Sequence, residues 1–159
     1  MKHHKNKPDF EFVVEPIEFD KYTGRELLQY CLGATLYTPG TRNVVRGIIN
    51  KRWPELTSMV MCFEDAIPEK DLAKAENNVL KTLEKMKKAI DDGTISKNDI
   101  PLFILRVRNL EQFVDFSKRL TKEHISLITA FNFPKFTSEN GQDYFKHLEY
   151  LNNIHEYII

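Results

Sequence analysis

Apolar residues gather in four short runs, separated by longer stretches in which they recur at helical spacing. The runs are residues 34–38, 58–63, 101–107 and 125–130. They are nearly all apolar instead of alternating with polar residues, which is typical of strands buried on both faces of a parallel sheet. The intervening spacing predicts helices over residues 25–32, 42–51, 68–91, 109–120 and 141–154. Strands that alternate with helices indicate an α/β fold built from βαβ units.

The chain divides into an arm and one domain. Residues 1–24 begin with a polar segment that contains Pro8 and Pro16, and we interpret them as an N-terminal arm. Residues 25–159 carry the alternating pattern without an internal linker. The last three residues, 157–159, are apolar and resemble the start of a fifth strand.

Composition excludes several classes of protein. Lys+Arg and Asp+Glu both number 23, so no chain-wide basic field favours a nucleic-acid partner. No apolar run reaches the roughly 20 residues that span a bilayer, and residues 1–8 lead into no apolar segment typical of a signal peptide. Cys31 and Cys62 cannot form a disulfide framework. Reduced thiols then indicate a cytoplasmic protein.

Polar residues follow each predicted strand at its carboxyl end. Residues 40–42 follow the first strand, Glu64 and Asp65 the second, residues 106–109 the third, and Lys135 lies after the fourth. In α/β folds, ligands bind outside the carboxyl ends of the strands. This recurring position therefore predicts the functional site.

Strand alternation places Arg106 and Arg108 on one face of the third strand. Buried guanidinium groups need an anionic ligand or carboxylates as partners. The alternative is a structural ion pair with Glu64 or Asp65. These two carboxylates are adjacent and point to opposite faces, so at most one faces the site, and either can instead cap a helix or form an ion pair.

The remaining candidates each have an ordinary alternative. Lys135 can bind a phosphate or carboxylate, or it is a solvated loop lysine. Arg42, beside Gly40 at a predicted helix start, can hold an anion together with backbone N–H groups, or it is an exposed helix arginine. Cys62 is expected to be a thiol of the core.

Four segments resemble a known family. Residues 36–42 resemble the LFVPG-x-R segment of the HpcH/HpaI aldolase and citrate lyase beta-subunit family, and residues 62–67 resemble its DLEDAV segment. Residues 105–109 resemble VRVN, and Pro134 with Lys135 resembles the PK after the fourth strand. Cys62 stands where the family has Asp, and Arg108 shifts the Asn to position 109. The chain is most similar to the branch called C–C bond lyases of the TIM-barrel fold.

The resemblance implies a (β/α)₈ barrel that makes or breaks a carbon–carbon bond beside a carboxylate. The substrate is expected to be a small carboxylate or an acyl-CoA, with its enolate stabilised by Mg²⁺ and an arginine. By position, Arg106 corresponds to the substrate-binding arginine. Glu64 and Asp65 correspond to active-site carboxylates, and Lys135 corresponds to an active-site cation.

A complete barrel takes about 250 residues. We therefore expect residues 25–159 to form the N-terminal half of a barrel, with about four βα units and with the metal ligands beyond Ile159. A half barrel has two open sheet edges and inward apolar residues without an opposite wall. We expect it to be inactive alone and to form a homo-oligomer or to need a complementing C-terminal half. A non-catalytic module that binds an anion or a protein is the alternative function.

Overall fold

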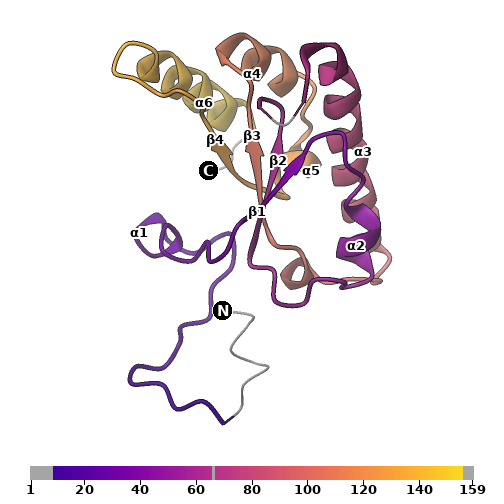
Figure 1. Ribbon diagram of the computed structural model, residues 1–159, viewed down its shortest axis with the longest axis vertical. Helices are drawn as coiled ribbons and strands as arrows, with labels where there is room; N and C mark the ends of the chain where they lie inside the picture. Colours follow the sequence, from indigo (N-terminus) through magenta and orange to yellow (C-terminus); the bar gives the residue numbers. More distant parts are fainter. Residues whose placement is uncertain (1–8, 66, 156–159) are drawn as a thin grey trace.

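A computed structural model describes residues 9–65 and 67–155. Its four strands are β1 (Leu36–Pro39), β2 (Ser58–Cys62), β3 (Leu102–Arg106) and β4 (Ile128–Asn132). All neighbouring pairs are parallel, in the order β1-β2-β3-β4 (Figure 1). The predicted α/β fold with sequential parallel strands is confirmed. The expected fifth strand at residues 157–159 lies outside the described residues.

The helices follow the strands, with bounds that differ from the prediction. They are α1 (Arg25–Leu28), α2 (Val45–Ile49), α3 (Leu72–Asp91), α4 (Leu110–Ser117), α5 (Lys122–Ile125) and α6 (Gly141–His155), with 3₁₀ turns η2 (Glu69–Asp71) and η3 (Lys97–Asp99). Helix α2 begins later than predicted because the Arg42 N–H donates to the Pro39 carbonyl, which closes a turn. Val44, not Thr41, precedes the helix, and it provides no side-chain cap.

The region before β4 differs most from the prediction. Helix α4 begins as predicted, because the Asn109 side chain accepts the Gln112 N–H at 2.9 Å. It ends at Ser117, and the short helix α5 follows. Thr121 caps α5 by accepting the His124 N–H. Strand β4 therefore starts three residues later than predicted, since Ile125 completes α5.

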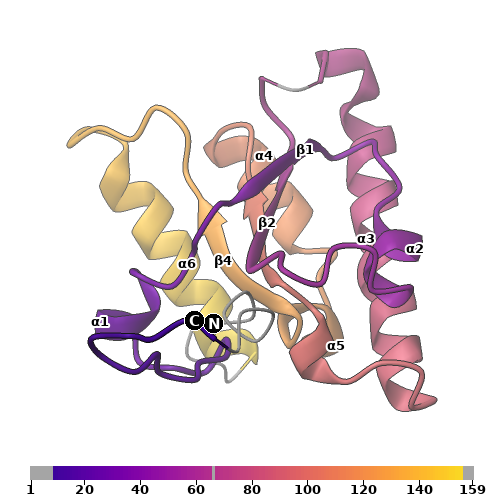
Figure 2. The ribbon, with the colours of Figure 1, turned by 60° about the horizontal axis from the view of Figure 1, so that its bottom comes forward.

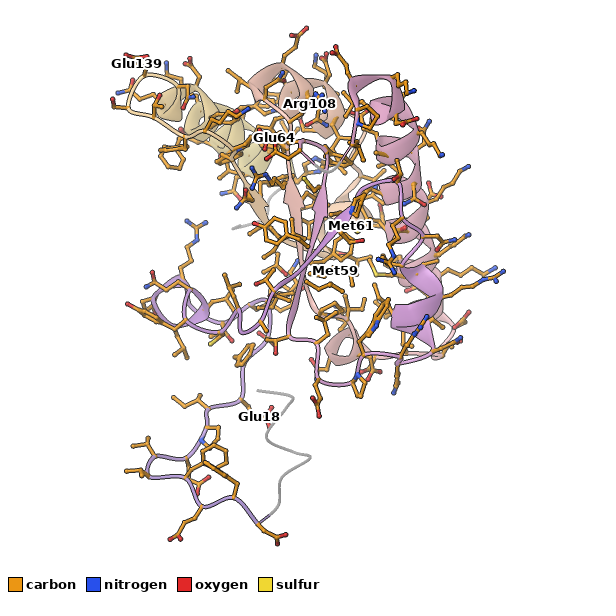
Figure 3. The ribbon with its side chains drawn as sticks, in the orientation of Figure 1. Glu18, Met59, Met61, Glu64, Arg108 and Glu139 are labelled. Carbon is orange, nitrogen blue, oxygen red and sulfur yellow. The ribbon has the colours of Figure 1, made fainter. Side chains whose placement is uncertain are left out.

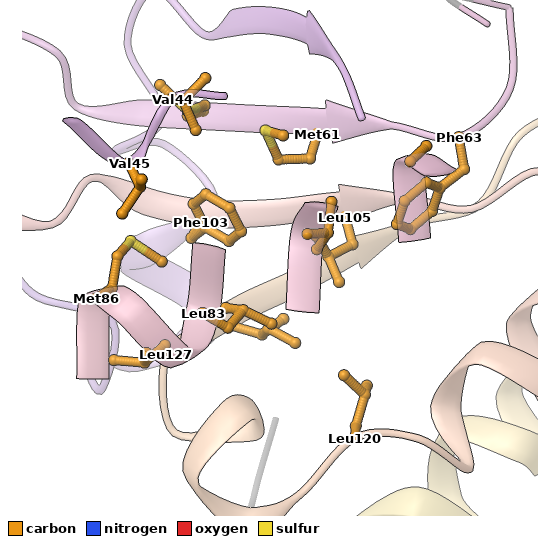
Figure 4. Close-up of a cluster of buried hydrophobic side chains, with 14 of the residues drawn as sticks. Val44, Val45, Met61, Phe63, Leu83, Met86, Phe103, Leu105, Leu120 and Leu127 are labelled. Carbon is orange, nitrogen blue, oxygen red and sulfur yellow. The ribbon is translucent and has the colours of Figure 1, made fainter. Parts of the chain in front are cut away.

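The main core lies between the sheet and α3. One face of β2 and β3 contributes Met59, Met61, Phe103 and Leu105, all fully buried. Helix α3 covers them with a stripe that includes Val79, Leu83 and Met86 (Figure 4). Completely burying one such side chain contributes about 1.5–3 kcal/mol. This packing fixes the strand ends relative to α3.

A smaller core holds α6 against the end of β4. It contains Val107, Phe113, Tyr144 and Leu151. The Phe113 ring lies 4.9 Å from Phe131 and 5.2 Å from Phe133, measured between centroids. This aromatic cluster anchors the segment that continues to Lys135.

The opposite face of the sheet is better covered than expected. Val60, Cys62 and Ile104 are only 2 %, 3 % and 6 % exposed, so the expectation that inward apolar residues lose their cover is wrong for them. In register, Val60 lies between Tyr37 of β1 and Ile104 of β3, so neighbouring strands shield it from both sides. The exposed apolar side chain on this face belongs instead to the edge strand β1, where Tyr37 is 51 % exposed.

The N-terminal arm passes the end of the sheet at which the strands begin (Figure 2). The Lys21 ammonium donates to the carbonyls of Ile125, Ser126 and Ile128, at 3.2, 2.8 and 2.8 Å. Lys21 thus ties the arm to the connection between α5 and β4. Among the described residues, no helix combines the length and the apolarity that crossing a membrane requires.

Candidate functional site

Arg106 and Glu64 form an ion pair at the carboxyl ends of two neighbouring strands. Arg106 is the last residue of β3 and pairs in register with Cys62, which ends β2. Glu64 lies two residues further along. Its Oε2 accepts hydrogen bonds from Nε of Arg106, at 2.9 Å, and from Nη2. Figure 3 shows Glu64 and Arg108 at this end of the strands.

Lys135 approaches Glu64 from the loop after β4. Its Nζ lies 3.1 Å from Oε1 of Glu64 and forms an ion pair with it. The angles at the two atoms do not meet the requirements of a hydrogen bond. The backbone of Lys135 has a φ of 50°, a left-handed conformation that residues other than glycine rarely adopt. The Asn140 side chain supports this conformation by donating to the Lys135 carbonyl at 3.0 Å. The loop therefore keeps a strained residue beside a buried carboxylate, which is common at functional sites.

The two adjacent carboxylates differ in burial. The Glu64 side chain is 7 % exposed, whereas that of Asp65 is 72 % exposed. Asp65 Oδ2 still accepts from Nη2 of Arg106 at 3.2 Å. Both carboxylates therefore form ion pairs with Arg106, as the structural alternative predicted. Only Glu64 is buried inside the site.

The charges at the site stabilise one another. Burial acts to raise the pKa of Glu64, but the hydrogen bonds from Arg106 and the positive charges of Arg106 and Lys135 outweigh it and hold that pKa below its usual value. The hydrogen bond that Arg106 donates to Glu64 raises the pKa of Arg106, and the Tyr37 side chain adds to this rise. Burial, with a smaller effect of the Glu64 charge, raises the pKa of Tyr144. Glu64 is therefore ionised at neutral pH.

Arg108 has different partners from those predicted. Strand β3 ends at Arg106, and Nη1 of Arg108 donates to the carbonyls of Phe63 and Ile67, at 2.9 and 3.3 Å. Neither an anionic ligand nor an ion pair with Glu64 or Asp65 accounts for these bonds. Arg108 instead binds the backbone around the two carboxylates.

Gly40 and Arg42 lie apart from this cluster. Gly40 is buried, and a Cβ there would lie 3.0 Å from Ala75 Cβ and from Phe63 Cδ1. This close approach to α3 explains the glycine by packing. Arg42 is exposed, and no described contact joins its side chain to Arg106, Glu64 or Lys135. Their roles in substrate binding stay predictions.

The described residues do not fit a Mg²⁺ ion. Residues 9–65 and 67–155 contain no group of three or more His, Cys, Asp or Glu side chains able to hold a metal. Glu64 faces two cations, Arg106 and Lys135, which disfavour a third positive charge. That the metal ligands lie beyond Ile159 stays a prediction.

Two tyrosines near the site were missed by the sequence reasoning. The Tyr37 side chain of β1 helps to raise the pKa of Arg106, and the Glu64 charge helps to raise the pKa of buried Tyr144 of α6. The signal for Tyr37 was available, since alternation places it on the same sheet face as Pro39 beside the first strand end. Tyr144 had no such signal, because its position depends on how α6 packs.

Parallel strands with helices between them, and charged side chains at the strand carboxyl ends, are the architecture of barrel enzymes. The family described as C-C_Bond_Lyase of the TIM-Barrel fold matches residues 26–159. The chain belongs to this family of carbon–carbon bond lyases. No curated protein matches the sequence significantly.

Proposed function

We propose that this chain supplies the carboxylate-binding side of a lyase that cleaves or forms a carbon–carbon bond next to a carboxylate. The observation that carries the proposal is the position of Arg106. It ends a strand, it is partly buried, and Glu64 and Asp65 fix its Nε and Nη2. Its Nη1 donates to neither carboxylate, so this nitrogen can receive a substrate oxygen. Because Glu64 and Asp65 fix the guanidinium, the N–H groups of Nη1 are held in place for a charge-assisted hydrogen bond to a carboxylate oxygen.

Lys135 and Tyr37 complete the proposed binding site. Lys135 is 83 % exposed while its ammonium contacts Glu64, so it can turn to an incoming anion at little cost. Tyr37 interacts with Arg106 from the edge strand. Two cations at one rim would stabilise negative charge that develops beside the bound carboxylate.

The resemblance to the HpcH/HpaI and citrate lyase beta-subunit family supports a small carboxylate or acyl-CoA as the substrate. Mg²⁺ remains our proposal for the complete barrel, where it would stabilise an enolate, with ligands that are not among the described residues. Strands β1 and β4 are the edges of the described sheet. We propose that a second copy or a complementing C-terminal segment supplies the opposite wall of the barrel. A cytoplasmic location is part of the same proposal.

Binding of malonate, a small dicarboxylate, tests the role of Arg106 in the chain itself. Malonate titrated into ¹⁵N-arginine-labelled protein should shift the Arg106 Nε–H resonance saturably. Arg106→Lys should weaken binding at least about tenfold, because Lys keeps the charge but its single nitrogen cannot pair with Glu64 and present a separate fixed N–H to the ligand. Arg119→Lys is the matched control, since the described partners of Arg119 are Glu76 and Asn77 and not Glu64 or Asp65. Unchanged affinity in Arg106→Lys, or no saturable shift in the native chain, would refute the proposal.

A further inference from the structure

We propose that Arg108 is a positioning residue that holds Glu64 against Arg106. This inference rests on the function proposed for Arg106. Arg108 contacts neither Glu64 nor Asp65 in the described structure. It acts through the backbone on either side of them, at Phe63 and Ile67.

The first argument is the place where the sheet ladder stops. The Phe63 N–H donates to the Arg106 carbonyl at 2.9 Å, as in a continuing parallel ladder. The next bond of that ladder would run from the Arg108 N–H to the Phe63 carbonyl. That N–H donates instead to Oε1 of Gln112, at 3.0 Å. The guanidinium of Arg108 takes over the Phe63 carbonyl, so a side chain replaces the missing backbone donor.

The second argument is the shape of the segment that carries the carboxylates. The Ile67 N–H donates to the Glu64 carbonyl at 3.1 Å, which closes a turn. Arg108 Nη1 binds the residue before this turn and the residue that ends it. Glu64 and Asp65 therefore lie between two anchored carbonyls. Since buried carbonyls need donors, the turn depends on the guanidinium for its satisfied backbone.

The third argument is that Arg108 itself is fixed. Gln112 is 6 % exposed, and its Oε1 accepts from the Arg108 backbone while its Nε2 donates to Glu76 of α3 at 2.8 Å. Glu76 also pairs with Arg119 at 2.9 Å. These contacts join the start of α4 to α3 and leave the Arg108 side chain to reach the turn. The segment just after β3 thus determines where Glu64 lies, because Arg108 holds the turn that carries Glu64.

The test measures the titration of the Glu64 carboxyl by carbon NMR, which requires no substrate. The groups that face Glu64 are Arg106 from β3, Lys135 from the loop after β4 and Tyr144 from α6. In Arg108→Met, we expect the pKa of Glu64 to rise toward its ordinary value of 4.5, because the turn relaxes and the contacts with Arg106 lengthen. Arg108→Lys keeps a donor for the carbonyls and should restore most of the native titration.

Controls separate positioning from a through-space effect of charge. Lys87→Met removes a positive charge that pairs with Asp91 at the C-terminal end of α3, outside the contacts that hold Arg108, and it should leave the Glu64 titration unchanged. The Glu64 side chain is only 7 % exposed, so salt would screen little of a charge effect, and the comparison uses Arg108→Gln, which removes the same charge as Arg108→Met. Arg108→Gln, which retains one N–H donor group, should show a smaller rise and serves if the Met variant does not fold.

The outcomes distinguish this inference from the proposed function. If Arg108→Met and Arg108→Gln leave the Glu64 titration unchanged, or if both raise the pKa of Glu64 equally, Arg108 is not a positioning residue. Malonate binding at Arg106 in the native chain would then still support the carboxylate site. If native binding fails but the titration responds as expected, the inference about position holds and the proposed function fails.

Discussion

Replacing Glu64 by glutamine removes one negative charge from the strand ends while preserving size and shape. In the native chain, Oε2 of Glu64 accepts two hydrogen bonds from Arg106, and Oε1 lies 3.1 Å from the Lys135 ammonium. In Glu64→Gln, the amide oxygen can still accept both bonds from Arg106. The amide nitrogen then faces Lys135, which turns to solvent. The change therefore isolates the contribution of charge.

The expected loss of stability is about 2 kcal/mol. A hydrogen bond to a charged group contributes roughly 1.5–3 kcal/mol, and both bonds in Glu64→Gln keep the charged Arg106 donor but lose the charged acceptor, so we expect each to lose about 1 kcal/mol. The Lys135 side chain is 83 % exposed, so its ion pair adds little. The matched control is Asp65→Asn at the neighbouring position. Its side chain is 72 % exposed, and the expected loss is below about 1 kcal/mol.

Urea unfolding followed by circular dichroism measures both variants, and pH provides a second check. The pKa of Glu64 is lowered in the folded chain, so its ion pair stabilises the protein above the ordinary pKa of 4.5 and is lost as pH falls through the lowered value. The difference between native chain and Glu64→Gln should therefore shrink in acid. Equal losses for Glu64→Gln and Asp65→Asn at pH 7, or a difference independent of pH, would refute this account of the site.

Three further predictions concern the framework of the site. Gly40→Ala should destabilise the chain by about 1–3 kcal/mol, because its Cβ meets Ala75 and Phe63 at 3.0 Å; a urea midpoint equal to the native one would contradict this. Burial and the Lys97 charge lower the pKa of Lys21 to about 8, so the ¹³Cε resonance of Lys21 should titrate near pH 8. A titration midpoint near 10.4 would show that the arm is not docked. Phe113→Ala should cost about 3–5 kcal/mol and loosen α6, measured by urea unfolding and by amide exchange in α6; unchanged exchange there would show that Phe113 does not anchor the helix.

The sequence reasoning succeeded where strand alternation decides the outcome. Buried runs predicted parallel strands, and the common position of polar residues at their carboxyl ends predicted that Arg106 and Glu64 would meet. The same rule failed at Arg108, because alternation applies only while the strand continues, and β3 ends at Arg106. Beyond that residue the chain turns, and the side chain finds backbone carbonyls. The point at which a ladder stops depends on the neighbouring strand, which local sequence does not report.

The position of Lys135 was open for a different reason. The PK segment indicated an active-site cation, but Lys135 contacts Glu64 from a backbone conformation with positive φ. A lysine adopts that conformation only when surrounding contacts compensate for its strain. Here the Asn140 side chain and the packed aromatic residues before the loop provide them. Such compensation is a property of the folded loop, so the sequence alone could not decide between a solvated lysine and a site residue.

The balance of charge at the strand ends bears on the carboxylate site that we propose. Glu64 and Asp65 neutralise Arg106 and Lys135, which allows partly buried charges to persist without a ligand. Arg108 adds one further positive charge at the same rim, and its described partners are uncharged carbonyls. The cluster therefore carries one positive charge in excess. A bound carboxylate would neutralise it, whereas a divalent cation would increase it, and on this ground the rim favours the substrate over the metal.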